Sequence, residues 1–114
     1  MYSINETPVF QKVFDLLKEY HTLRSKFPKT EKYTLGERIE ETILTALIGI
    51  IEAGHVKKEW KLQPIEQSLR KTELAKILFR LAFETRCITE RQYLTTGEQL
   101  QRIGQMLGGW RRSL

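Results

Sequence analysis

The chain has 114 residues, of which 40% are hydrophobic and 29% are charged. This is ordinary usage for one globular domain and excludes a chain that is disordered throughout. The single cysteine, Cys87, excludes a disulfide scaffold. The longest apolar stretch, residues 43–51, is far shorter than the roughly 20 residues that cross a bilayer, and no signal-peptide pattern opens the chain. We therefore expect a single cytoplasmic domain over residues 1–114, with no membrane contact.

The net charge of +5 comes from 19 basic and 14 acidic side chains, and it is not spread evenly. Residues 1–57 carry eight of each kind, whereas residues 58–114 carry eleven basic and six acidic side chains. The whole excess belongs to the second half, where it would form a positive surface suited to phosphate groups.

Two helices are predicted in the first half of the chain. Thr7 followed by Pro8 is typical of a helix start, and the apolar residues that follow have helical spacing until a break at Phe27-Pro28. The second helix is predicted to begin at Thr34, which has Glu37 three residues later and so matches a capping box, and to end near His55.

A third helix is predicted after Pro64. Its inward stripe is expected to follow the three- and four-residue spacing of a helix and to consist of Ile65, Leu69, Leu74, Ile77, Leu78, Leu81 and Thr85. On an ideal helical wheel Phe79 and Phe83 lie on the opposite side, which predicts that they form an interface between subunits. The alternative is a helix rotated slightly from this wheel, which would bury Phe83 at the edge of a single core.

A fourth helix is predicted to begin after Thr89, which has Gln92 three residues later and repeats the capping-box pattern. Its apolar face consists of Tyr93, Leu100, Ile103, Met106, Leu107 and Trp110. Four amphipathic helices with short connections and no strand signal predict an all-α fold, an antiparallel up-down-up-down four-helix bundle.

The sequence offers little for catalysis or metal binding. His21 and His55 stand in no Cys–His or Asp–His pattern, and Cys87 has no second cysteine. The Glu-x-x-His pattern of bundle metal sites occurs once, at Glu52 and His55, without a second copy. We therefore expect no enzyme activity, no catalytic residues, no cofactor and no metal.

Binding through basic side chains is the remaining interpretation. The candidate nucleic-acid or polymerase contacts are mostly arginines, which suit bidentate phosphate contacts: Arg70, Lys76, Arg80, Arg86, Arg91, Arg102 and Arg112. The alternative for each of them is an ordinary solvated helix charge.

Several segments resemble one family. Residues 27–36 resemble the entry to the second helix in a large bacterial group of small four-helix-bundle proteins, which includes those encoded in ribosomal RNA intervening sequences. Residues 78–84, 88–93 and 103–110 resemble the branch of accessory variability determinant (Avd) proteins of diversity-generating retroelements.

The resemblance implies a homopentameric ring of bundles that associates with the reverse transcriptase of the retroelement and, without sequence preference, with RNA or DNA. In that family the polymerase performs the chemistry, copying a template RNA with errors at adenines before the cDNA is homed into a target gene. Arg80, Arg86 and Arg102 would then be candidate contacts, and Phe79, Phe83 and Trp110 structural or interface positions. The alternative function is an orphan bundle oligomer, similar to the intervening-sequence proteins, that acts as a structural or protein-interaction module.

Overall fold

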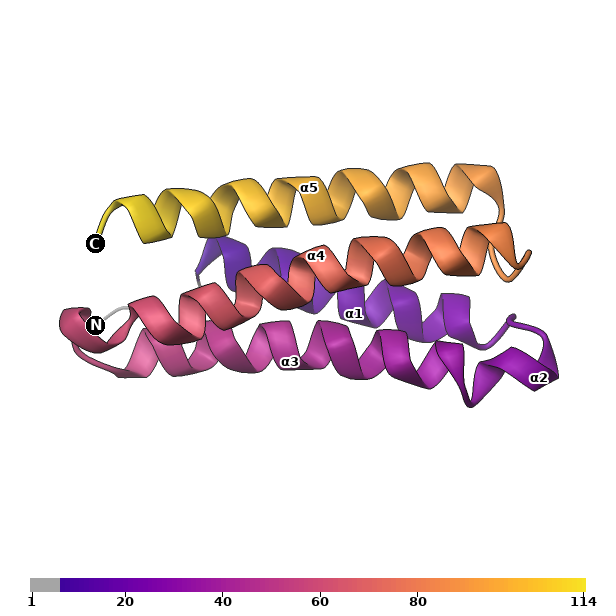
Figure 1. The fold of residues 1–114 in the computed structure, drawn as a ribbon, viewed down its shortest axis with the longest axis horizontal. Helices are drawn as coiled ribbons and strands as arrows, with labels where there is room; N and C mark the ends of the chain where they lie inside the picture. The colour runs from indigo at the N-terminus through magenta and orange to yellow at the C-terminus, as the bar shows by residue number, and fades with distance from the viewer. Residues whose placement is uncertain (1–6) are drawn as a thin grey trace.

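The computed structural model describes residues 7–114, and over this range the chain is helical with no strand. Four long helices lie side by side in an elongated bundle of 43 × 20 × 19 Å (Figure 1). The elements are α1 (Pro8–Arg24), α2 (Lys29–Lys32), α3 (Leu35–His55), the 3₁₀ helix η2 (Lys58–Trp60), α4 (Leu62–Glu84) and α5 (Glu90–Arg112). The predicted all-α four-helix fold is confirmed, with two short helices added in the connections.

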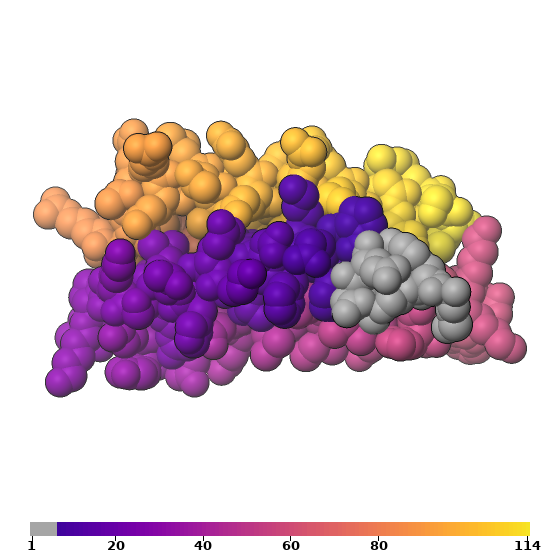
Figure 2. All heavy atoms as spheres, turned by 180° about the vertical axis from the view of Figure 1, so that it is seen from behind, coloured from indigo at the N-terminus to yellow at the C-terminus, as the bar shows by residue number. Residues whose placement is uncertain are grey.

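The long helices are neighbours in chain order. α3 packs on α1 and α4, and α5 packs on α4 and α1, so that each long helix has two main neighbours. Seen from behind, α1 in indigo lies between α5 in orange and yellow and α3 in purple and magenta (Figure 2). α4 lies on the far side, opposite α1, and α5 packs on both of them, so α4 and α5, which carry most of the basic excess, are neighbours.

Tyr20 on α1 ties the helices together in the core. Its hydroxyl donates a buried hydrogen bond of 2.8 Å to the carbonyl oxygen of Gly36 at the start of α3. Its ring meets Phe27 and Phe79 edge to face, with centroids 6.0 and 5.5 Å apart. Burial raises the pKa of Tyr20, because an ionised phenolate would lose its hydration there. The side chain is therefore a neutral donor.

The predicted start of α5 is confirmed in detail. The Thr89 hydroxyl accepts a hydrogen bond from the backbone N–H of Gln92 at 3.1 Å, and the Gln92 side chain accepts one from the backbone N–H of Thr89 at 2.9 Å. This reciprocal capping box satisfies two backbone donors that the helix leaves unpaired.

The capping box predicted at Thr34 is wrong. The Thr34 side chain makes no capping bond to α3. The extra turn α2 precedes it, and the Thr34 hydroxyl donates instead to the backbone carbonyl of Thr30 at 3.2 Å. Thr7 also makes no side-chain cap, although Pro8 does occupy the first turn of α1 as predicted.

The predicted orientation of α4 is wrong as well. Phe79 is buried in the core with 1% of its surface exposed, whereas Ile77 and Leu81, which were assigned to the inward stripe, are 64% and 47% exposed. Because α4 is apolar on two sides, periodicity alone does not say which side faces inward. The alternative for Phe83 fits the structure: its ring is partly buried and stacks on Tyr93 with centroids 4.9 Å apart.

Close packing of α3 on α4 depends on Gly49. A β-carbon at this position would lie 2.7 Å from the carbonyl oxygen of Pro64 and would overlap the hydroxyl of Ser68. Ser68 is fully buried and donates a hydrogen bond of 2.7 Å to the carbonyl of Ala46. The absence of a side chain at Gly49 therefore allows this bond between the two helices.

We predict that Gly49→Ala lowers the free energy of unfolding by about 1–3 kcal/mol, because the added methyl group overpacks a buried helix contact. Gly104→Ala is the matched control. It also lies in a helix interior, but its β-carbon would meet nothing within 4 Å, so alanine should raise stability by about 0.5–1 kcal/mol. Urea denaturation followed by circular dichroism measures both, and equal effects of the two substitutions would contradict the close packing.

Candidate nucleic-acid interface

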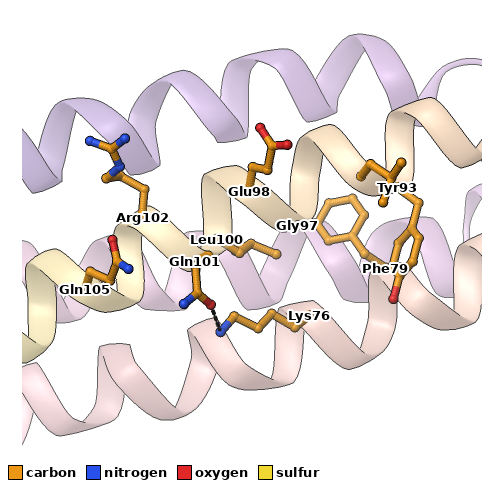
Figure 3. A pocket seen from close by; sticks show the side chains of 10 residues that line it. Lys76, Phe79, Tyr93, Gly97, Glu98, Leu100, Gln101, Arg102 and Gln105 are labelled. Carbon is orange, nitrogen blue, oxygen red and sulfur yellow. Dashed lines mark hydrogen bonds between the residues drawn. The ribbon is translucent and has the colours of Figure 1, made fainter.

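A groove of about 580 Å³ runs between α4 and α5 (Figure 3). Buried Phe79 and Leu100 contribute to its apolar lining, and Lys76, Arg102 and Gln105 contribute polar groups. The Lys76 ammonium, from α4, donates a hydrogen bond of 3.3 Å to the side-chain oxygen of Gln101, from α5, as the dashed line in Figure 3 marks. The groove therefore combines cationic, amide and apolar groups from two helices.

The backbone of α5 is open along this groove. Gly97 lines the groove, and a β-carbon there would meet no heavy atom within 4 Å. Tyr93 lines it too, with its ring stacked on Phe83. An incoming group can therefore approach both the main chain and an aromatic ring.

Two of the seven predicted cations, Lys76 and Arg102, line this groove together. Lys76 lies 3.1 Å from a carboxylate oxygen of Glu73. Arg80, one turn further along α4, is exposed and forms a 2.8 Å hydrogen bond with Glu84. This bond raises the pKa of Arg80. Lys76 and Arg80 therefore have acidic partners within the chain, which weakens the field that they present to a phosphate.

The other predicted cations are exposed and spread along the molecule. Arg86 lies in the turn between α4 and α5, Arg91 lies in the first turn of α5, and Arg112 is the last residue of α5. Arg70 is six residues before Lys76 and so about 120° away from it around α4. The structure thus brings Lys76 and Arg102 together on one groove, whereas Arg91 lines a separate hollow between α5 and α1. It does not bring all seven into one pocket.

Arg86 adopts a left-handed backbone conformation with φ of 64°. It ends α4 in a Schellman motif, in which the N–H of Cys87 donates to the carbonyl of Ala82 at 2.7 Å and the N–H of Arg86 to that of Phe83 at 3.0 Å. Glycine is the usual residue at this position because a β-carbon there is unfavourable. The chain keeps a charged side chain at a site where glycine would cost less.

We predict that Arg86→Gly raises the free energy of unfolding by about 0.5–1 kcal/mol. Glycine relieves the backbone strain at this position, and this gain exceeds the loss that arises because glycine makes the unfolded chain more flexible. The same substitution should weaken oligonucleotide binding if the side chain contacts phosphate. Arg86→Ala removes the charge but keeps the strain, so it should weaken binding without stabilising the fold. Thermal unfolding and oligonucleotide titration measure the two effects separately, and a less stable Arg86→Gly protein would refute the strain argument.

The other candidate chemistry is sparse. Among residues 7–114 no three histidine, cysteine or acidic side chains lie close enough together to hold a metal ion. His21 lies 3.6 Å from Glu40, which also pairs with Arg24 at 3.3 Å. No helix in the described part of the chain is both long and apolar enough to span a membrane.

One basic segment was missed by the sequence reasoning. Lys57, Lys58 and Lys61 surround Trp60 in the connection between α3 and α4, and Trp60 is 69% exposed. The signal was present in the sequence as three lysines within four residues of a tryptophan, a combination of charge and aromatic ring that suits nucleic-acid contacts. Dividing the chain at residue 57 to count charges separated Lys57 from Lys58 and Lys61, so the cluster did not stand out.

The fold defines a class of small antiparallel four-helix bundles, and this member carries a net charge of +5. A sequence model of the bAvd-like family matches residues 9–114, and the chain belongs to this family. The predicted resemblance to Avd proteins is thereby confirmed, and membership fits an accessory role in diversity-generating retroelements. No curated protein and no solved structure matches the chain.

Proposed function

We propose that this protein is a non-catalytic accessory subunit of a diversity-generating retroelement, which binds the element's reverse transcriptase together with template RNA or cDNA in the cytoplasm. The observation that supports nucleic-acid binding best is the band of exposed arginines on and beside α4 and α5: Arg80, Arg86, Arg91, Arg102 and Arg112. Family membership supports the retroelement context.

The mechanism is electrostatic tethering. Arginine side chains on the surface neutralise phosphates and release condensed counterions, which favours binding of any RNA or DNA sequence. A protein that holds the polymerase at the same time raises the local concentration of template near the enzyme. No group on this chain then needs to take part in bond making.

We predict that replacing Arg86, Arg91 and Arg102 by glutamine weakens binding to a generic oligonucleotide. Loss of three phosphate contacts should reduce the slope of log K against log salt by about 2 for a single strand. The matched control replaces three exposed lysines, Lys18 on α1, Lys26 in the following connection and Lys29 on α2, by glutamine, and so removes the same charge elsewhere. Fluorescence anisotropy over 50–200 mM salt measures both variants.

Equal losses in the two variants would mean that the arginine band is not the site. A wild-type protein that binds no oligonucleotide even at 50 mM salt would refute nucleic-acid binding. That result would favour the alternative, a bundle oligomer that acts as a structural or protein-interaction module.

Assembly into a ring, a homopentamer as in the resembling family, is also part of the proposal. The support for self-association is an apolar stripe on the outside of α4, formed by exposed Ile77 and Leu81 with half-buried Leu74. Five copies would together carry a charge of about +25, five times the +5 of one chain.

We predict that Ile77→Asp combined with Leu81→Asp yields folded, helical monomers, because carboxylates are costly to bury in an apolar contact but not on an exposed helix face. Tyr33→Asp is the control, since Tyr33 is 67% exposed but lies outside the stripe. Light scattering and circular dichroism measure mass and fold. Oligomers that survive the double substitution would exclude this stripe as the interface.

A further inference from the structure

The connection between α3 and α4 presents an exposed tryptophan among lysines. We call residues 57–61 the Trp60 turn, and its centre is the short helix η2. Lys57, Lys58 and Trp60 are exposed. Glu59 is the one acidic residue of the turn, against three lysines. The turn therefore offers both a flat apolar ring and positive charge to solvent.

The turn is held in place by the rest of the bundle. The N–H of Trp60 donates to the carbonyl of Lys57 at 2.8 Å, which closes the 3₁₀ turn. The Lys61 ammonium donates to the carbonyl of Ala53 near the end of α3, and it lies 5.9 Å from the ring centroid of Trp110 on α5. Because Lys61 is anchored to both neighbouring helices, a ligand at Trp60 would bind a preformed surface.

The two tryptophans of the chain differ in their surroundings. Trp110 is partly buried against the core and faces Lys61. Trp60, in contrast, has no stacked ring and no cation over it among residues 7–114. Its exposed indole is therefore available to a partner.

Further positive charge gathers at this end of the bundle. The C-terminal turn of α5, with Arg111 and Arg112, lies at the same end as the Trp60 turn (Figure 1). Arg111 bridges 3.8 Å to Glu66 in the first turns of α4, which confirms that the two segments are close. Arg112 is exposed. This charge favours a polyanion over a neutral or basic partner.

We propose that the Trp60 turn is a binding site for single-stranded nucleic acid, in which the indole stacks on a base and Lys57 and Lys58 contact the flanking phosphates. The proposal rests on the proposed nucleic-acid function and adds strand selectivity to it. A duplex covers the faces of its bases, so only a single strand can offer one to the indole. Stacking does not depend on base identity, which suits a protein that binds any sequence.

The test uses the full chain with Trp110→Phe, which leaves Trp60 as the one fluorescent tryptophan. A 20-nucleotide oligo(dT) strand should quench the Trp60 emission, because a stacked base quenches an indole. A blunt-ended DNA duplex, which has no unpaired bases, should bind with little quenching. Vesicles containing anionic phosphatidylglycerol are the third probe, because a membrane surface also binds lysine and tryptophan.

Affinity measurements complete the test. Trp60→Ala should weaken oligo(dT) binding by about 5- to 150-fold, the range for loss of one stacked base, whereas Trp60→Phe should retain most of the affinity. Lys57→Gln with Lys58→Gln should lower the salt slope by about 1.4, for two single-strand phosphate contacts. Trp60 is exposed, so these variants should unfold at the wild-type temperature, which calorimetry verifies.

The outcomes separate this site from the general function. If oligo(dT) binds but neither quenches Trp60 nor responds to Trp60→Ala, the Trp60 site is wrong and nucleic-acid binding through the arginine band stands. If no oligonucleotide binds the wild-type protein at low salt, the proposed nucleic-acid function fails and this site fails with it. A response of Trp60 to the vesicles alone would overturn the proposal in favour of a lipid surface.

Discussion

The rotation of α4 about its own axis is the constraint on which the rest of the structure depends. α4 has apolar residues on two sides, and one bundle can bury only one of them. The Phe79 ring packs against Tyr20 in the core, and buried Ser68 bonds to the carbonyl of Ala46 over Gly49. These two contacts fix the rotation, because each requires the same side of α4 to face inward. Ile77 and Leu81 are then left in solvent, and Lys76 is turned toward α5.

That rotation also determines where the positive charge acts. With Phe79 inward, Lys76 and Arg80 lie on the part of α4 that borders α5, and Arg102 joins Lys76 on the same groove. The acidic neighbours Glu73 and Glu84 pair with the two α4 cations, whereas Arg86, Arg91 and Arg112 form no ion pair within residues 7–114. The strongest electrostatic contribution therefore comes from the ends of α4 and α5 rather than from the middle of the groove. A long polyanion that runs along the bundle would meet both ends, and a compact anion would meet only one.

The sequence predicted the parts of the fold that depend on local chemistry. The capping box at Thr89 and the four long helices follow from spacing within a few residues, and the structure confirms them. The side of α4 that faces inward was predicted wrongly because the buried side includes small and polar residues such as Ser68 and Thr72. The contacts that select this side, Phe79 with Tyr20 and Ser68 with Ala46, join residues 59 and 22 positions apart in the chain. The groove and the exposure of Trp60 were missed for the same reason, since both depend on how separate helices pack.

Several positions in this chain hold a residue type that is unfavourable for the local backbone conformation or for its exposure to solvent. Arg86 occupies a left-handed position where glycine is favoured, and Gly97 and Gly104 lie in the interior of α5, where glycine is unfavourable, although a β-carbon would fit at either position. Trp60 leaves a large ring in water. In contrast, Gly49 in the middle of α3 breaks the helix rule for a clear packing reason. Unfavourable residues that no contact within the protein explains tend to occur at functional surfaces. Here they fall on α5 and on the two connections that flank α4, where the exposed cations also lie, and this coincidence supports these surfaces as the ones that meet the partners of the protein.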